Sequence, residues 1–342
     1  MSRSRMIFTS LIAFMLITAC APEAPNPTQV TSPVLPTAST TVTPQSTNIP
    51  NPTDTPLPTP TLKIFPTATL PGGGLGQIVF SSDRGGSYDD LYLLDIKSSQ
   101  VDRLTRGDSN TFAGPFSPDG SRILFTGFGL THSYVGLMNA DGTGQIDLTQ
   151  RPDSDEGFPA WSPDGSQIAF TSRRDGNNEI YLMNADGSDP KRLTNDPKDD
   201  FAPAWSPDGT RIAFVSDRQN ETGYYNLYLM NADGSNVQRL TQDSKFDYSP
   251  SWSPDGEWIA FRSPHGGAAD IYIIRPDGSE LHNLTNNPFD DWAPTWSPDG
   301  QLIAFQTNRD GNWEIYTMHA DGSGLLNLTN NPADDELPYW RP

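Results

Sequence analysis

Acidic and basic side chains recur at two fixed positions along this chain, at spacings that suit ion pairs or a charged binding surface. The acidic position holds a carboxylate in five of six copies, namely Glu156, Asp200, Asp247, Asp291 and Asp335. The basic position also holds a base in five of six copies, namely Arg84, Arg174, Arg218, Arg309 and His265. One copy has Thr111 and Gly129 at these places, so acid and base are lost together. This joint loss indicates that the two positions interact.

Two interpretations of these charges remain open. In the first, Asp335 pairs with Arg84, Asp200 with Arg218, and so on around a ring, and the pairs tie loops together. An exposed pair of this kind contributes only about 0–1 kcal/mol, and a partly buried, bidentate pair contributes more. In the second, the same residues form a charged rim around a central channel and recognise a ligand.

Aromatic residues accompany the acids. The position after the carboxylate is Phe201, Tyr248 and Trp292 in three consecutive copies. Aromatic side chains beside acids suit sugars, basic peptides or a protein surface. The alternative is that they pack the loops against a neighbouring part of the fold. We therefore take the acids, the bases and these three aromatics as a candidate binding face.

The element that positions these residues is a repeat of roughly 45 residues. Its clearest copy contains Trp-Ser-Pro-Asp-Gly at 161–165, Ile-Ala-Phe at 168–170, Glu-Ile-Tyr-Leu-Met-Asn-Ala-Asp-Gly-Ser at 179–188 and Arg-Leu-Thr at 192–194. Each copy has four short runs that alternate as half-buried antiparallel strands do, separated by tight-turn sequences. A period of this length is typical of a β-propeller.

The repeat predicts an all-β fold, a six-bladed β-propeller with four antiparallel strands per blade. The Ile-x-Phe run and the Leu-Thr pair each occur six times. The first copy lacks its innermost strand, and residues 337–342 contain that strand alone. We therefore expect the C-terminal strand to complete the first blade and close the ring, which removes open sheet edges.

The residues before the propeller predict a lipoprotein. Residues 1–20 have a basic start, a short apolar core and a lipobox, Ile17-Thr-Ala-Cys20, so they are interpreted as a lipoprotein signal peptide. Cys20 is the only cysteine and is the predicted lipidation site. Residues 21–74 are rich in Pro and Thr and predict a disordered tether, followed by the propeller at 75–342.

Composition and motifs limit the function. The formal charge of −20 disfavours nucleic acid and anionic lipid surfaces as partners. The chain has no Gly-x-Ser-x-Gly, His-Glu-x-x-His or phosphate-binding loop, and its four histidines lie in different repeats. We therefore expect no catalytic residues, no cofactor, no metal site and no enzymatic activity.

The unit quoted at 161–194, repeated at 296–329, resembles the TolB-type, WD40-like propeller repeat. The resemblance covers residues 75–342. It implies a six-bladed propeller outside the cytoplasm that binds a protein at the mouth of its channel, as TolB binds a peptidoglycan-associated lipoprotein. TolB carries a folded α/β domain before its propeller, whereas this chain has the lipobox and tether there.

The sequence thus predicts a monomeric, extracytoplasmic propeller anchored to a bacterial membrane only through lipid on Cys20. Its expected role is a non-catalytic binding platform for another protein of the cell envelope. The alternatives are binding of a carbohydrate or cell-wall glycan and, less favoured, a propeller lyase or hydrolase.

Overall fold

The computed structural model describes residues 76–219, 223–242, 246–264 and 267–342. These residues all belong to one of the two units into which the chain divides, Leu62–Pro342. The predicted signal peptide, Cys20 and tether lie outside the described residues. In the part of the chain that is described, no helix is long and apolar enough to cross a membrane.

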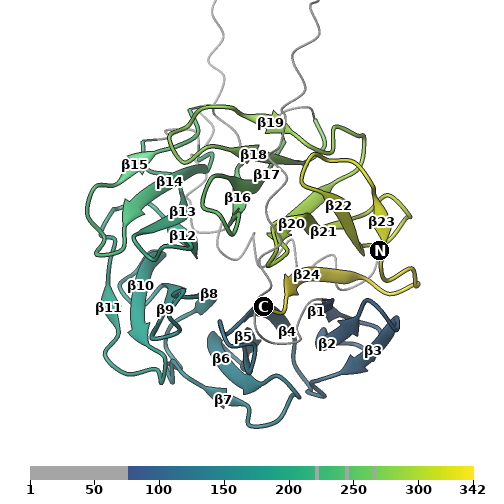
Figure 1. Cartoon of the computed structure of the whole chain (residues 1–342). Coiled ribbons are helices and arrows are strands. Elements are labelled where there is room, and N and C mark those ends of the chain that lie inside the picture. Colours follow the sequence, from purple (N-terminus) through teal and green to yellow (C-terminus); the bar gives the residue numbers. More distant parts are fainter. Residues whose placement is uncertain (1–75, 220–222, 243–245, 265–266) are drawn as a thin grey trace, which may run out of the picture. The chain divides into compact units, whose positions relative to one another are not determined.

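The described residues form six four-stranded antiparallel sheets, which surround a common centre as the blades of a propeller (Figure 1). Blade 1 contains β24 (Asp335–Trp340), β1 (Gln77–Ser82), β2 (Asp90–Asp95) and β3 (Gln100–Arg103). Blade 2 contains β4 (Thr111–Phe116), β5 (Arg122–Phe128), β6 (Ser133–Asn139) and β7 (Ile146–Asp147). Blade 3 contains β8 (Glu156–Trp161), β9 (Gln167–Ser172), β10 (Glu179–Asn184) and β11 (Lys191–Arg192).

The other three blades follow the same order from the inside outward. Blade 4 contains β12 (Asp200–Trp205), β13 (Arg211–Ser216), β14 (Asn226–Asn231) and β15 (Gln238–Arg239). Blade 5 contains β16 (Tyr248–Trp252), β17 (Ile259–Ser263), β18 (Asp270–Ile274) and β19 (His282–Asn283). Blade 6 contains β20 (Asp291–Trp296), β21 (Leu302–Thr307), β22 (Glu314–His319) and β23 (Leu326–Asn327). The predicted six-bladed fold is confirmed.

The Ser-Pro-Asp-Gly turn joins the first two strands of a blade, as in blade 3. The amide of Gly165 donates to the carbonyl of Ser162 at 2.9 Å, and Gly165 has a φ of 71°, which favours glycine. The Ser162 hydroxyl donates to Asp164 at 2.6 Å and accepts the amide of Gln167 at 2.9 Å. The turn therefore satisfies its own polar groups and fixes the register of the hairpin.

The hydrophobic core lies between the blades. Ile168 and Phe170 pack with residues of blade 2, whereas Ala169 packs with residues of blade 4. This follows from the two-residue period of a strand, which sends successive side chains to opposite faces. Trp161 is 8% exposed and packs between blades 2 and 3, as expected for an inner-strand tryptophan.

The C-terminal strand closes the ring, as predicted. β24 pairs antiparallel with β1, with Ile78 opposite Trp340 and Ser82 opposite Asp335. Beyond the strand, the amide of Arg341 donates to the carbonyl of Gln77 at 2.9 Å. The two ends of the propeller thus share one sheet (Figure 1).

Candidate functional site

The structure brings together the predicted acid–base pairs on one face of the propeller. Each acid begins an innermost strand, and each arginine follows the second strand of the same blade. Among the described residues, ion pairs join Asp335 to Arg84 at 2.6 Å, Glu156 to Arg174 at 2.8 Å, Asp291 to Arg309 at 3.0 Å, and Asp200 to Arg218. The pairing inferred from their joint loss in blade 2 is present in these four blades.

Each arginine is held by more than its acid, as blade 4 illustrates. The Nε of Arg218 donates to the hydroxyl of Ser216 at 3.0 Å, while Nη2 binds Asp200. The guanidinium also lies over the rings of Phe214 and Tyr228, at 5.1 and 5.4 Å from their centroids. A cation over an aromatic face is stabilised by the ring quadrupole. The repeat therefore builds a clamp of acid, hydroxyl and two rings around each arginine.

The clamps are interior features rather than an exposed charged rim. The side chains of all four paired acids are 0% exposed, and those of the arginines are 10–22% exposed. Burial raises the pKa of Asp200 to about 7, although the Arg218 charge acts in the opposite direction. Because the carboxylates are enclosed, a ligand on this face would meet the arginine edges and the surrounding loops, not the acids.

Two blades depart from the clamp. In blade 2, Thr111 pairs with Gly127 in the β4–β5 ladder and carries no ion pair. In blade 5, Asp247 is fully buried and accepts a long bond of 3.4 Å from the Asn226 amide, while His265 lies outside the described residues. The predicted Asp247–His265 pair therefore stays a prediction.

The structure corrects the placement of two of the three candidate aromatics. Phe201 is 5% exposed and Tyr248 is 8% exposed, and both belong to the core between blades 4 and 5. Their rings lie 5.6 Å apart, and Phe201 also meets Tyr225 edge-on at 4.9 Å. A ligand would therefore not contact Phe201 or Tyr248 as surface residues.

The rings of Tyr225 and Tyr248 cover Phe201, and a bulge follows it in the innermost strand. The register of β12 against β13 shifts between Phe201 and Ala204, and Ala202 has a φ of 53°. An extra residue in a strand bends it and changes the direction of its side chains. In blade 4, the ring before the bulge packs against the neighbouring blade instead of facing solvent.

Other aromatics on this face remain partly accessible. Trp292 and Trp313 are half-buried, and their ring centroids lie 5.3 Å apart in blade 6. Tyr224 and Phe246 are also half-buried and meet edge-on at 4.9 Å beside blades 4 and 5. These four side chains present aromatic surface next to the clamps.

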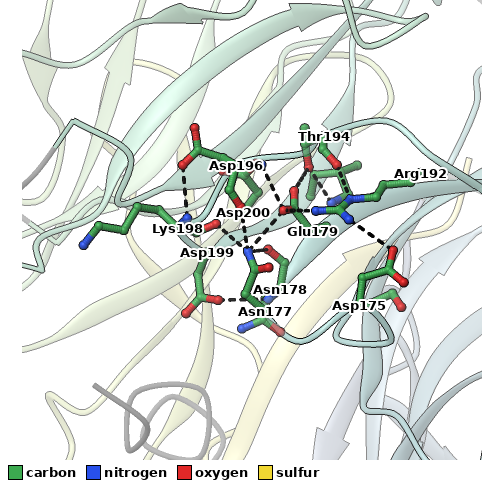
Figure 2. Close-up of polar contacts among 12 residues, drawn as sticks. Asp175, Asn177, Asn178, Glu179, Arg192, Thr194, Asp196, Lys198, Asp199 and Asp200 are labelled. Carbon is green, nitrogen blue, oxygen red and sulfur yellow. Dashed lines mark hydrogen bonds and ion pairs between the residues drawn. The ribbon is translucent and has the colours of Figure 1, made fainter. Parts of the chain in front are cut away.

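A second hydrogen-bond network joins the outer strands of a blade, and it was not predicted from the sequence. In blade 3, Glu179 accepts bonds from Arg192 at 2.5 Å and from the Thr194 hydroxyl at 2.6 Å (Figure 2). The amide of Asp196 and the side chain of Asn177 donate to the same carboxylate at 3.0 and 3.1 Å. The recurring Leu-Thr pair could have predicted it, because the threonine hydroxyl donates to the carboxylate at the centre of this network.

One open pocket lies between blades 2 and 3, beside the loop that departs from the clamp. Its volume is about 370 Å³, within the range of small-molecule sites. The lining residues are Thr131, His132, Pro152, Asp153, Ser154, Asp155, Arg173 and Gly176. The Ser154 hydroxyl is buried and has no hydrogen-bond partner among the described residues. Such a lining offers hydroxyl, carboxylate and cationic groups to a polar ligand.

The histidines do not converge in the described part of the chain. His132 lines the pocket, His282 lies in β19 with its ring 5.7 Å from that of Trp258, and His319 ends β22. No group of three or more His, Cys, Asp or Glu side chains among the described residues is arranged to hold a metal ion.

The comparison with known protein families identifies the fold independently. The TolB beta propeller domain matches residues 111–226 and 219–291, which together span more than half of the chain. The chain belongs to the TolB beta-propeller family. A search of curated proteins found no match.

Solved structures agree with this assignment. TolB from Acinetobacter baumannii is 26% identical, with a TM-score of 0.69 over 80% of this chain and 69% of that one. A putative TolB from Agrobacterium tumefaciens is 22% identical, with a TM-score of 0.60 over 79% of this chain and 100% of that one. Kuenenia stuttgartiensis hydrazine synthase shares only the fold, at 15% identity and a TM-score of 0.64 over 78% of this chain and 46% of that one. Since this fold also occurs in an enzyme, the fold by itself does not decide the activity.

Proposed function

We propose that this TolB-like propeller is a non-catalytic platform that binds another protein of the bacterial cell envelope. The observation that carries the proposal is a face whose loops are fixed by four buried ion pairs and that leaves aromatic surface accessible beside them. Rigid loops lose little conformational entropy on binding, and half-buried aromatic side chains supply much of the energy at protein interfaces.

The proposed contact surface, the aromatic face, consists of Trp292, Trp313, Tyr224 and Phe246. It replaces the surface predicted from Phe201 and Tyr248, which are core residues. The family supports the choice of partner, since the TolB-type repeat implies protein binding at the mouth of the channel. The strongly acidic composition disfavours nucleic acid.

The test is co-purification from the solubilised envelope of the source organism. The full-length chain serves as bait, and Trp313→Ala is compared with the wild type. Leu325→Ala is the matched control, because Leu325 is 48% exposed in a turn at the other end of its blade. A specific protein lost with Trp313→Ala and retained with Leu325→Ala supports the proposal. Equal recovery with both variants excludes this face.

We further propose that the propeller acts outside the cytoplasm and is attached to the membrane by lipid on Cys20. The support is the lipobox at 17–20 followed by the Pro- and Thr-rich segment. Cys20→Ser removes the attachment atom, so the protein should move from the membrane fraction to the soluble fraction. Unchanged fractionation of Cys20→Ser excludes the lipid anchor.

A second candidate function is binding of a cell-wall glycan, favoured by the pocket between blades 2 and 3. Sugars bind through networks of hydroxyl and carboxylate partners, and the lining supplies both. Retention on purified wall polysaccharide that Asp153→Asn abolishes would favour this function, because Asp153 is an exposed carboxylate of the lining. Retention that Asp153→Asn leaves unchanged would exclude the pocket.

A further inference from the structure

A repeated contact joins the innermost strand of one blade to the second strand of the preceding blade. In four blades, the third residue of the inner strand donates its amide hydrogen to a side-chain oxygen of the neighbouring blade. The bonds are Ala113 to Ser81 at 2.8 Å, Phe158 to Thr126 at 3.3 Å, Ala202 to Thr171 at 3.0 Å and Leu337 to Gln306 at 2.8 Å. This contact satisfies a buried amide and links the blades.

Blade 5 places a cation at this position, which holds an acceptor in four blades and Val215 in blade 4. The corresponding residue is Arg262 in β17, opposite Tyr248 in the strand ladder. An arginine has five N–H donors and no acceptor, so it cannot take the place of a serine, threonine or glutamine oxygen. Blade 4 also lacks the acceptor, but its valine brings no polar group, whereas the arginine adds a positive charge and donors that need a partner.

Arg262 lies between two aromatic rings. Its guanidinium carbon is 5.1 Å from the centroid of Tyr248 and 4.4 Å from that of Trp292, in the next blade. The rings stabilise the charge by cation–π attraction and hold the side chain in one orientation. The position lies beside the aromatic face, at the seam between blades 5 and 6.

Among the described residues, the side chain of Arg262 makes no hydrogen bond and no ion pair, and its Nε is buried without an acceptor. Burial lowers the pKa of Arg262, while Tyr248, Asp290 and Asp247 act in the opposite direction. The stacked arginines of the clamps each have a carboxylate, and Arg275, stacked over Trp258 at 4.1 Å, pairs with Glu257 at 3.0 Å. The residue as a whole is partly buried, and within the described part of the chain Nε is the one guanidinium nitrogen of Arg262 that is enclosed without a partner.

We propose that Arg262, held between Tyr248 and Trp292, is the binding site for a carboxylate group of a polypeptide partner. A planar guanidinium binds a carboxylate through two parallel hydrogen bonds, which would satisfy the unpartnered donors. Arg262 itself covers the adjacent ring faces of Tyr248 and Trp292, which leaves those faces closed to a stacked sugar. The inference rests on the proposed protein-binding function and assigns one chemical group of the partner.

The test is saturation-transfer NMR on the full-length chain with three small probes. N-acetylglycine mimics a peptide carboxylate, N-acetylglycinamide is its neutral counterpart, and glucuronate represents an acidic sugar. We expect a saturable signal from N-acetylglycine and a much weaker one from N-acetylglycinamide, because only the former can accept a bidentate, charge-assisted bond. This comparison uses the wild type alone and does not depend on the folding of a variant.

Two variants locate the site. Arg262→Gln should weaken N-acetylglycine binding by about fivefold or more, because it removes the positive charge and the paired N–H donors of the guanidinium. Arg275→Gln is the matched control and should retain binding, since Arg275 already has Glu257 as a partner. Thermal melts establish that both variants fold.

Three results would overturn the proposal. The first is the absence of an N-acetylglycine signal in the wild type, and the second is an undiminished signal in folded Arg262→Gln. The third is binding of glucuronate without binding of N-acetylglycine. The last result would assign the site to an acidic glycan. Each of these leaves the envelope co-purification with Trp313→Ala unaffected, so the failure of the carboxylate site and the failure of the protein-binding function are distinguishable.

Discussion

The seam at which β24 closes the ring should make the stability of the propeller depend on pH through Asp89. Asp89 precedes β2, is 9% exposed, and lies near the carboxylates of Asp83, Asp90 and Asp334. Burial first, and then these like charges, raise the pKa of Asp89 from 3.8 to about 7. The folded protein therefore holds a proton on Asp89 that the unfolded chain releases.

The sign and size of the effect follow from linkage. Between pH 4 and 7 the folded state binds more protons at Asp89 than the unfolded state, so the free energy of unfolding falls as pH rises. A difference between 3.8 and about 7 corresponds to roughly 4 kcal/mol at pH above 7. Relaxation and water entry reduce such penalties, so we expect Asp89→Asn to stabilise the protein by about 1–3 kcal/mol at pH 8.

Asparagine is a suitable replacement because blade 3 has Asn178 at the corresponding position, also directly before its third strand. The assay is urea denaturation of the wild type and Asp89→Asn at pH 5 and pH 8. The gain should be largest at pH 8 and small at pH 5, where Asp89 is already protonated in the folded protein. Thermal melts should show an increase of about 2–4 °C per kcal/mol.

The exposed Asp108→Asn serves as the control for the change in net charge, because Asp108 makes no contact with the seam carboxylates. It should change the stability of the propeller equally little at the two pH values. If Asp89→Asn gives no more stability at pH 8 than at pH 5, or behaves as Asp108→Asn does, the electrostatic account of the seam is wrong.

Three further outcomes test the fold. Deleting residues 337–342 removes most of β24 and opens the ring, so the truncated protein should unfold at a clearly lower urea concentration than the parent. An unchanged urea midpoint would contradict ring closure. Arg218→Met should cost about 1–3 kcal/mol, because it removes the partner of Asp200 and the buried carboxyl then takes up a proton. A double-mutant cycle with Asp200→Asn should recover a coupling above about 1 kcal/mol, and purely additive losses would refute the pairing. Thr194→Val should cost about 1–3 kcal/mol in chemical denaturation, because the Thr194 hydroxyl donates to Glu179 and accepts the amide of Ile180. The exposed Thr210→Val should cost less. Equal costs would contradict a special role for the Leu-Thr threonine.

Much of the fold could be predicted because the chain repeats itself. Six copies of one unit give the strand order, and the missing strand in the first copy predicts the closure that β24 provides. The same register places Asp200 and Arg218 at one end of their blade, so their contact followed from alignment of the copies. Repetition thus substitutes for the long-range information that a single sequence usually lacks.

The contact surface could not be predicted to the same extent, because it depends on local backbone geometry. The positions after the acids hold aromatics, but Tyr225 and Tyr248 enclose Phe201 in the core between blades 4 and 5, whereas Trp292 is only half-buried beside an equivalent bulge at Ala293. The residue types do not predict a left-handed backbone conformation at an alanine. The role of Arg262 could not be predicted from the sequence either, because the acceptor role of its equivalents in four blades is visible only in the contacts between blades.

The central claim is that the aromatic face binds another envelope protein, and site-specific photo-crosslinking in living cells tests it most directly. A photoreactive phenylalanine analogue replaces Trp313 on the face, and Leu325 at the opposite end of blade 6 as the control. Our account predicts one specific crosslinked protein from position 313 and none from position 325. Crosslinking that is absent at position 313, or the same from both positions, would contradict it.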